Sequence, residues 1–387
     1  MLIRQAVLDD LSTDQLVKLA ALEDITPQLV LVFGSIKLID QAPLLAQLAQ
    51  RFPEAERVGC STAGEVYTVG VAQGSIVVTA LHFDHPSFRV ATTELTAMDA
   101  SHEAGTQLAN GLTAPDLKAV WVFCQGVNIN GSALVEGMIS QLGHGVQICG
   151  GLAGDDGAFK SSLTLCNAGV SATRLVAVGF YGDTLIHSHG SFGGWHAFGQ
   201  ERQVTRCDGN VLYELDGEPA LSVYKRYLGD HAKGLPSSGL LFPFEMTGRL
   251  QSPDSRVIRT ILGINEASGS LILAGEIYLG CQLRLMYSHT DKLIDGARDA
   301  ANLTRQLLPP HTGPSLALLV SCIGRKLVMG KHVSEEVSAV AEVLEGAVTL
   351  AGFYSYGEIS PDADTLQCEL HNQTMTIAYL AEAADAP

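Results

Sequence analysis

Apolar and polar positions along this chain follow a pattern that occurs three times. Each copy begins with an apolar run typical of a buried strand, at residues 29–33, 119–123 and 316–320. A small polar turn follows, and then apolar residues recur at i, i+3, i+4 and i+7, which predicts a helix with one apolar face. The three helical stripes are Leu45/Leu48/Ala49/Phe52, Val135/Met138/Ile139/Leu142 and Val337/Val340/Ala341/Leu344. A second strand then enters a glycine-rich turn, so we expect three strand–helix–strand modules.

Further elements are predicted around each module. Helices are expected at residues 9–21, 100–112 and 292–308, the last ended by two prolines, and closing strands at 175–180 and 374–380. Residues 74–83 are apolar on both faces of a strand pattern, which is typical of a central strand. The mixture of parallel crossovers and added strands predicts an α/β fold with mixed sheets.

A different pattern fills residues 184–290, between the second and third modules. It is rich in glycine and in short strand patterns, at 257–261, 271–274 and 278–286. Residues 236–253 contain three prolines and several turn residues, which favours a long loop or lid. We therefore predict two packed domains of repeated modules, residues 1–183 and 184–387, with a Gly/Pro-rich insertion at about 230–255.

Composition narrows the possible partners. A chain of 387 residues is long enough for two domains, and a net charge of -17 argues against nucleic acid and anionic membrane surfaces. No charged-then-apolar leader is present, and no apolar run approaches the ~20 residues that cross a bilayer. The eight cysteines form no CxxC pair, so a zinc ribbon or a dithiol site is not supported. The chain is expected to be cytoplasmic.

The three glycine-rich turns are the first candidates for a ligand site. Their sequences are GCSTAGE at 59–65, GGLAGDD at 150–156 and GFYSYGE at 352–358. Small residues at strand ends let a ligand approach the backbone, and free N–H groups there can hold an anion. The candidate residues are Cys60, Ser61, Gly64, Glu65, Gly150, Gly151, Asp155, Tyr356 and Glu358. The alternative is that glycine only permits a sharp turn and the acid accepts a hydrogen bond from a neighbouring N–H.

Arg325 is the candidate for binding an anionic group. It follows a buried strand and a glycine, so its guanidinium can bind a carboxylate bidentately at the end of the sheet. Tyr356 and Glu358 would complete such a site, with Glu358 pairing an ammonium group. An internal ion pair between Arg325 and Glu358 explains the same residues. His371 is expected one strand over, as a ligand contact or as a hydrogen-bond partner at the strand end.

Several motifs occur in the order found in one known family. They include VGCSTAGE at 58–65, GGLAGD at 150–155, Gly194-Trp195 with LDGEPA at 215–220, SCIGR at 321–325, GFYSYGEI at 352–359 and HNQT at 371–374. The chain resembles the FIST family of sensory proteins along nearly its whole length, through FIST N and FIST C domains. The resemblance implies a ligand-sensing module of bacterial signal transduction, with small molecules such as amino acids as ligands. Stand-alone members of this size look like nitric-oxide-sensing haemoproteins that act on a partner histidine kinase.

A haem would need an axial ligand facing an apolar slot. His187 and His189 lie two residues apart, so on a strand they point to the same side, near Phe192 and Trp195. The alternative is that both are solvated in a glycine-rich segment. No CxxCH motif occurs, so any haem would be bound non-covalently.

Three hypotheses follow: a haem-based sensor, a protein that binds an amino-acid-like metabolite directly, and a cysteine-dependent enzyme. The enzyme would use Cys60 or Cys322, whose thiolate near Arg325 would have a lowered pKa. No cysteine-hydrolase signature surrounds either residue, so a sensor is favoured. The sensor hypotheses require the glycine-rich turns of different modules to converge on one shared cavity.

Overall fold

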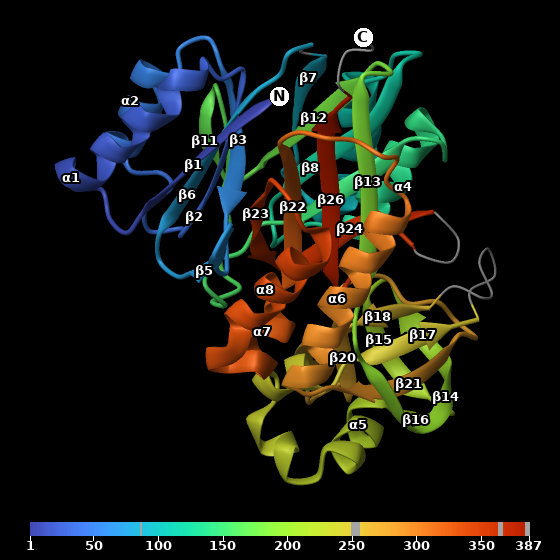
Figure 1. The fold of residues 1–387 in the computed structure, drawn as a ribbon. Helices are drawn as coiled ribbons and strands as arrows, with labels where there is room; N and C mark the ends of the chain where they lie inside the picture. Colours follow the sequence, from blue (N-terminus) through green and yellow to red (C-terminus); the bar gives the residue numbers. More distant parts are fainter. Residues whose placement is uncertain (86, 249–255, 363–366, 384–387) are drawn as a thin grey trace.

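The computed structural model describes residues 1–85, 87–248, 256–362 and 367–383. It consists of three similar α/β units and one inserted β-rich domain (Figure 1). We call them unit 1 (residues 2–82), unit 2 (88–181), unit 3 (185–192 and 290–382) and the inserted domain (196–287). The predicted α/β class with mixed sheets is confirmed.

Unit 1 shows the plan that the other units follow. An edge strand precedes a parallel strand–helix–strand crossover, then a short hairpin, and then a strand that returns to the middle of the sheet. Its elements are β1 (Leu2–Leu8), α1 (Thr13–Leu16), η1 (Val17–Ile25), β2 (Leu29–Gly34), α2 (Ala42–Arg51), β3 (Glu56–Ser61), β4 (Glu65–Tyr67), β5 (Gly70–Ala72) and β6 (Ile76–His82). The helix predicted at 9–21 is a single α-turn followed by a 3₁₀ helix. The buried residues Leu19, Leu22 and Ile25 recur every three positions, which is the 3₁₀ period.

Units 2 and 3 repeat this order, with a longer α-helix in place of α1 and η1 between the edge strand and the crossover. Unit 2 comprises β7 (Phe88–Glu94), η2 (Met98–Ala100), α3 (Ser101–Asn110), β8 (Leu117–Cys124), α4 (Gly131–Leu142), β9 (Gln147–Leu152), β10 (Thr164–Cys166), β11 (Gly169–Ser171) and β12 (Arg174–Tyr181). Unit 3 comprises β13 (Leu185–Phe192), α6 (Thr290–Gln306), β22 (Ser315–Cys322), α7 (Ile323–Met329), η5 (Gly330–His332), α8 (Val333–Leu344), β23 (Val348–Ser355), β24 (Gly357–Pro361), β25 (Cys368–His371) and β26 (Met375–Glu382).

Each unit gives its hairpin to the sheet of another unit. The hairpin β4–β5 of unit 1 extends the sheet of unit 3, in the order β13-β26-β22-β23-β4-β5. The hairpin β10–β11 of unit 2 extends the sheet of unit 1, in the order β1-β6-β2-β3-β10-β11. The hairpin β24–β25 of unit 3 extends the sheet of unit 2, in the order β25-β24-β9-β8-β12-β7. The three units are therefore interlocked in a cycle.

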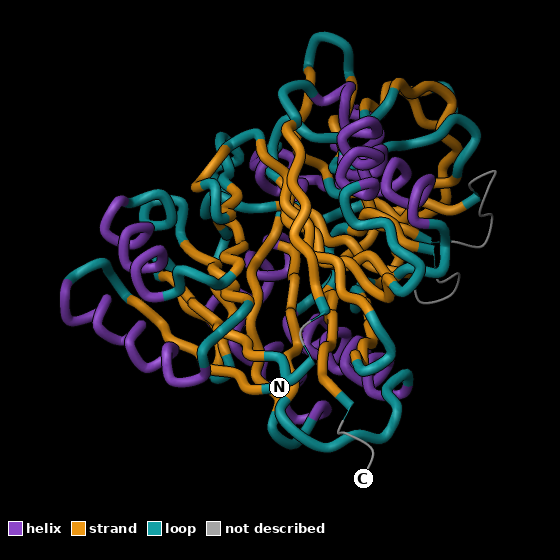
Figure 2. The backbone as a smooth tube through the Cα atoms, turned by 90° about the horizontal axis from the view of Figure 1, so that it is seen from above, coloured by secondary structure: helices purple, strands orange, loops and turns teal. Residues whose placement is uncertain are grey.

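The sheets enclose a central apolar core to which all three units contribute. Phe33, Phe123 and Phe353, one from each unit, meet there with ring centroids 5.0–6.2 Å apart. Figure 2 shows strands in the interior and helices toward the periphery. The helices bury their apolar stripes on the outer faces of the sheets, as the 3.6-residue period predicts.

A glycine lies at the same place in the second crossover strand of each unit. A Cβ atom on Gly59, Gly150 or Gly352 would lie 1.8–2.0 Å from a carbonyl oxygen of the neighbouring parallel strand. Gly150 and Gly352 also have positive φ angles, at 133° and 152°. These glycines permit close strand packing, which is a structural role.

The inserted domain is built on strands that pair antiparallel, in the order β18-β17-β21-β14-β15-β20-β19, and β16 pairs with β15. Its elements are β14 (His196–Asp208), β15 (Val211–Leu215), β16 (Glu218–Pro219), α5 (Ala220–Leu228), η3 (Gly229–Gly234), η4 (Ser237–Leu241), β17 (Phe244–Thr247), β18 (Val257–Arg259), β19 (Ile261–Asn265), β20 (Ser270–Leu273) and β21 (Gln282–Tyr287). It lies at the lower end of the molecule in Figure 1.

The loop predicted at 236–253 is partly regular structure. It contains η4 and β17, because Phe244 and Met246 bury their side chains in the core of the inserted domain. Residues 249–253 of the predicted loop lie outside the described residues.

Candidate functional site

The three glycine-rich turns converge on one another, but the first turn, residues 59–65, lines neither of the two cavities described below. Each turn lies where the chain leaves its own sheet for another, and backbone hydrogen bonds join the turns to one another. The amides of Ala63, Gly154 and Tyr356 donate to the carbonyl groups of Tyr354, Ser61 and Leu152, at 2.8, 2.9 and 3.0 Å. The turns thus form a single buried cluster at the ends of the sheets.

The acid of the first turn is satisfied by its own surroundings. Glu65 is fully buried and accepts hydrogen bonds from Thr62 Oγ1 at 2.5 Å and Ser75 Oγ at 2.7 Å. The backbone amide of Ser75 also donates to it, at 3.2 Å. Burial raises the pKa of Glu65 above its usual range. This arrangement agrees with the alternative in which the acid of the turn accepts hydrogen bonds from neighbouring groups of the protein and binds no ligand.

The acid of the third turn is equally enclosed. Glu358 accepts from the amide and the hydroxyl of Thr374, at 3.2 and 3.1 Å, and from Ser355 Oγ. Complete burial raises the pKa of Glu358 to about 8. His371 is opposite Glu358 on the neighbouring strand, one strand over as predicted, and its Nε2 lies 3.1 Å from the carbonyl oxygen of Ser360. Burial lowers the pKa of His371.

Asp155 of the second turn organises the loop that follows it. Its carboxylate accepts from three successive backbone amides, those of Phe159, Lys160 and Ser161, at 2.8, 2.8 and 3.0 Å. The hydroxyl of Tyr356, from the third turn, also donates to it. Asp155 and Tyr356 therefore meet, and together they fix the loop at 155–161.

The remaining turn candidates are enclosed by protein. Ser61 Oγ donates to the carbonyl group of Gly154 at 2.7 Å. A Cβ atom on Gly64 would lie 2.8 Å from Lys326 Nζ, and one on Gly151 would lie 2.6 Å from the carbonyl oxygen of Gly357. No space for a ligand borders these two glycines.

The cysteine candidates lie in the same buried surroundings. Burial raises the pKa of Cys60 and of Cys322, and for Cys322 it outweighs the opposing influence of Arg325. The lowered pKa expected for a thiolate near Arg325 is therefore wrong, because loss of hydration disfavours the thiolate more than the guanidinium favours it.

Arg325 forms a buried ion pair, but its partner is Glu336 and not Glu358. The guanidinium Nη2 lies 2.7 Å from the Glu336 carboxylate, and both side chains are fully buried. The guanidinium also donates to the carbonyl groups of Gly193 and Leu293. Glu336 lies on α8 beside the apolar stripe, which places its carboxylate over the end of β22. Each of the three guanidinium nitrogens of Arg325 thus donates to a group of the protein.

The two histidines proposed as haem ligands lie on β13. His187 Nδ1 lies 3.1 Å from the Gln147 side-chain oxygen. His189 is 3% exposed, and within the described residues neither ring nitrogen has a hydrogen-bond partner. Burial lowers the pKa of His189 to about 4, so the ring is neutral, as an axial ligand must be. Neither histidine lines the two cavities described below, so these side chains do not fit a haem in either cavity.

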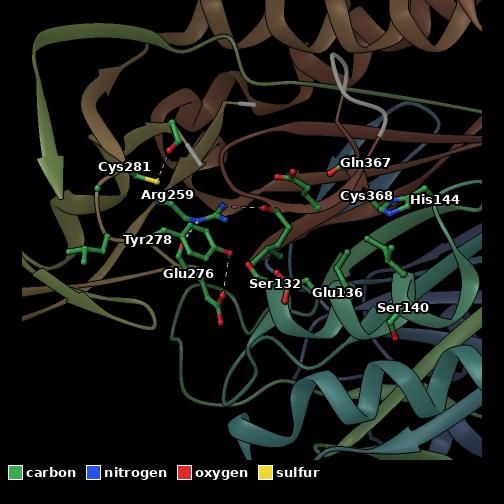
Figure 3. Close-up of a pocket in the computed structure, with 17 residues that line it drawn as sticks. Ser132, Glu136, Ser140, His144, Arg259, Glu276, Tyr278, Cys281, Gln367 and Cys368 are labelled. Atoms are coloured by element: carbon green, nitrogen blue, oxygen red, sulfur yellow. Dashed lines mark hydrogen bonds between the residues drawn. The ribbon is translucent and has the colours of Figure 1, made fainter. Parts of the chain in front are cut away.

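A cavity of about 680 Å³ lies between α4 of unit 2 and the inserted domain, and we call it cavity one (Figure 3). Side chains of α4 form one wall, and residues of the inserted domain form the opposite wall. The charged residues among the described lining are Glu136, Arg259, Glu276 and Glu369. The cavity is therefore acidic, with one guanidinium in its wall.

Two polar groups of cavity one are central to its chemistry. Glu276 accepts from the Asn130 amide at 2.7 Å and from the Tyr278 hydroxyl at 3.3 Å, which holds its carboxylate at the cavity. Ser132 is 8% exposed, and its Oγ has no hydrogen-bond partner within the described residues. A buried hydroxyl without a partner is costly, so it is often completed by water or by a ligand.

Arg259 fastens the inserted domain to unit 3. Its guanidinium donates to the carbonyl groups of Glu276 at 2.9 Å, Ile258 at 3.2 Å and Leu370 at 3.1 Å. Gly275 packs against it with φ at 126°, and a Cβ atom there would lie 3.0 Å from Arg259 Nε. The guanidinium is thereby held in the wall of cavity one.

A second cavity of about 700 Å³, cavity two, adjoins the first and shares Leu370 with it. Leu152 of the second turn and Tyr356 of the third both line it. Two of the three turns thus contribute to one cavity, through apolar and aromatic groups. The carboxylates of Glu65, Asp155 and Glu358 do not line this cavity, and they accept their hydrogen bonds from other groups of the protein.

None of the described residues that line cavity one is among the site candidates predicted from the sequence. One signal was available, because Arg259 interrupts an apolar strand pattern. A charge in such a position needs a partner or a function. The cavity itself arises where the inserted domain meets unit 2, and a contact between distant segments leaves no local pattern.

Two domains of one known protein family match this chain. Residues 28–218 match the FIST N domain, and residues 220–361 match the FIST C domain. Cavity one lies between them, because α4 belongs to the first match and Arg259 and Glu276 to the second.

The similar proteins with curated sequences are themselves uncharacterized. One from Mycobacterium bovis and one from Mycobacterium tuberculosis are each 27% identical over 270 residues, or 66% of this chain and 62% of the relative. The chain therefore spans less than two thirds of the length of these relatives. A crystal structure of cyanuric acid hydrolase from A. caulinodans aligns over 99% of both chains, with 10% identity and a TM-score of 0.38.

Two further properties of the described residues bear on the type of site. In the described part of the chain, no helix is both long and apolar enough to cross a membrane. Among those same residues, no three His, Cys, Asp or Glu side chains are grouped so that they could hold a metal ion.

Proposed function

Because this chain belongs to the FIST family, with a FIST N and a FIST C domain, we propose that it is a sensor of signal transduction whose ligand binds in cavity one. The ligand proposed is a small metabolite with an ammonium group, such as an amino acid. The observation that carries the proposal is the buried Ser132 hydroxyl, which lacks a described partner and lines an acidic cavity between the two family domains.

The charges of the cavity support this ligand class. Carboxylates of Glu136, Glu276 and Glu369 favour an ammonium group, and Arg259 attracts an anionic group on the same ligand. A drug-sized or smaller molecule fits a cavity of about 680 Å³. Ser132 Oγ would then donate to the ligand and complete its hydrogen bonding.

The position of the cavity supports a signalling role. A ligand that contacts both α4 and the inserted domain would favour the arrangement in which they close on it, and so shift the population of that arrangement. A signalling protein that recognises the arrangement would read the change. A partner histidine kinase, a haem cofactor and a response to nitric oxide remain predictions from the family resemblance.

Thermal unfolding with a panel of amino acids and simple amines tests this proposal. A ligand that binds the folded state alone stabilises it by about 2.7 kcal/mol at a hundred times its Kd, so the Tm should rise by several degrees. Glu276→Gln and Ser132→Ala should remove the rise. Glu266→Gln is the matched control, since Glu266 is an exposed acid of the same domain paired with Lys225.

The proposal fails if no amine raises the Tm, or if Glu276→Gln and Glu266→Gln respond alike. The absorption spectrum of the purified protein separates the haem alternative. A Soret band that shifts with nitric oxide would favour haem, and a colourless protein is what direct metabolite binding predicts.

A further inference from the structure

Cavity two differs in chemistry from cavity one. It lies between the loop that precedes α4 and strands β19 and β20 of the inserted domain. Among its described lining residues Asp99 is the one with a charged side chain, and Asn128, Asn130 and Asn210 supply amides. The remaining lining residues are apolar, aromatic or glycine. Such walls favour a neutral, largely apolar ligand, because a charge would lose its hydration there without compensation.

A stacked aromatic pair forms part of the wall. The rings of Phe159 and Tyr356 lie 4.1 Å apart, with an angle of 18° between their planes. Phe159 has φ at 51°, in the left-handed region, which is unusual for a bulky residue and costs about 1–3 kcal/mol. The Asp155 carboxylate maintains this conformation by accepting from the Phe159 amide at 2.8 Å. The protein therefore holds a strained backbone in place, and the ring that it positions lies in the cavity wall.

The rim of cavity two exposes apolar side chains to water. Met98, Leu262 and Ile272 are 45%, 41% and 37% exposed, and all three line the cavity. Single exposed apolar residues are ordinary, but several around one concave site indicate a binding surface. Leu262 and Ile272 come from the inserted domain and Met98 from unit 2, so the rim joins the two parts.

We infer that cavity two is a second binding site, which takes a neutral, apolar, ring-bearing small molecule. The stacked pair of Phe159 and Tyr356 gives an aromatic part of the wall against which the ring packs. The apolar rim covers the rest of the ligand, and the Asn128 side chain, which also lines the cavity, supplies an amide for a single polar substituent. The side chains of Asn130 and Asn210 already bond Glu276 and the Leu273 carbonyl group. The inference does not depend on an amine ligand in cavity one.

Titration with N-phenyl-1-naphthylamine, a neutral apolar dye whose fluorescence rises in apolar surroundings, tests the inference. We expect saturable binding at one site per chain. Leu262→Glu and Ile272→Glu each place a charge at the rim and should weaken binding about tenfold or more. Leu327→Glu is the matched control, because Leu327 is 50% exposed on α7 and lines neither cavity.

Unsaturable dye binding, or equal affinity in the Leu262→Glu and Leu327→Glu variants, would overturn the inference. Ile272→Glu repeats the test at a second rim position on β20. The amine-induced rise in Tm should persist in the rim variants, and dye binding should persist in Glu276→Gln. The proposal for cavity one and the inference for cavity two can therefore be contradicted independently of each other.

Discussion

The cluster of glycine-rich turns and the junction with the inserted domain are both places where distant segments meet, yet they differ in how their polar groups are satisfied. In the turns, Glu65, Asp155 and Glu358 each accept several hydrogen bonds from the protein. At the junction, Ser132 has no described partner and two cavities remain between the surfaces. Buried polar groups that all have hydrogen-bond partners stabilise the fold. A buried polar group that lacks a partner beside a cavity indicates where a ligand could bind.

The largest effect on stability is expected at the buried ion pair of Arg325 and Glu336, beside the turns. Glu336→Gln leaves the Arg325 charge buried without its carboxylate, and it weakens the acceptor for the hydroxyl groups of Tyr354 and Ser321. We expect the free energy of unfolding to fall by about 3–5 kcal/mol. Urea denaturation followed by circular dichroism measures the loss.

Glu342→Gln on the same helix is the control for that loss. Glu342 pairs with Arg298 at 3.6 Å on the surface, and its side chain is 69% exposed. Its removal should change stability by about 1 kcal/mol or less. Equal losses in the two variants would contradict a structural role for the buried pair.

Ionisation of Glu358 is expected to have an intermediate effect on the free energy of unfolding, and this effect depends on pH. Its pKa is raised to about 8 in the folded state from an ordinary value of 4.5. Between these pH values the unfolded chain loses the proton while the folded protein retains it. The contribution to stability is therefore full below pH 4.5 and is lost as the pH rises toward 8, by up to roughly 1.4 kcal/mol per pH unit.

Denaturation midpoints measured from pH 5 to pH 8.5 check this effect. Glu358→Gln should flatten the decline, because the amide does not titrate. Glu65, whose pKa burial also raises, contributes in the same direction and remains in the variant. An unchanged slope in Glu358→Gln would show that Glu358 is ionised throughout this range.

The smallest effect on stability is expected at the junction. Leu262→Glu alters a side chain that is 41% exposed, so it should change the free energy of unfolding by no more than about 0.5 kcal/mol. The same substitution is expected to weaken dye binding. Denaturation and dye titration of the same Leu262→Glu preparation measure the change in stability and the change in dye affinity. A large loss of stability would show that Leu262 has a structural role.

Periodicity predicted most of the fold. The three crossovers, the central strand β6 and helices α3 and α6 lie where the apolar pattern places them. The exchange of hairpins was not predictable in this way. The strands β4, β5, β10 and β11 are three residues long, and nothing in so short a pattern specifies which unit they join.

The candidate site was less predictable than the fold. The turns meet, as the pattern indicated, and of the two interpretations of Arg325 the internal ion pair applies, but with an acid other than the predicted Glu358. The partner is Glu336, eleven residues along the chain and on the following helix, because α8 places it over Arg325. Cavities one and two depend on how the inserted domain is positioned, which is decided by contacts such as that of Arg259 with Leu370. Contacts of this kind have no period in the sequence.

The cyclic exchange of hairpins has a consequence for how the chain can be divided. A fragment that ends at residue 218, with the FIST N match, would lack β24 and β25, which complete the sheet of unit 2. Its own β4–β5 hairpin would lose the sheet that receives it. The two family domains thus share sheets, because each contributes strands to a sheet of the other. During synthesis, the first complete sheet becomes possible once β10 and β11 have emerged, and the other two must wait for the C-terminal third of the chain.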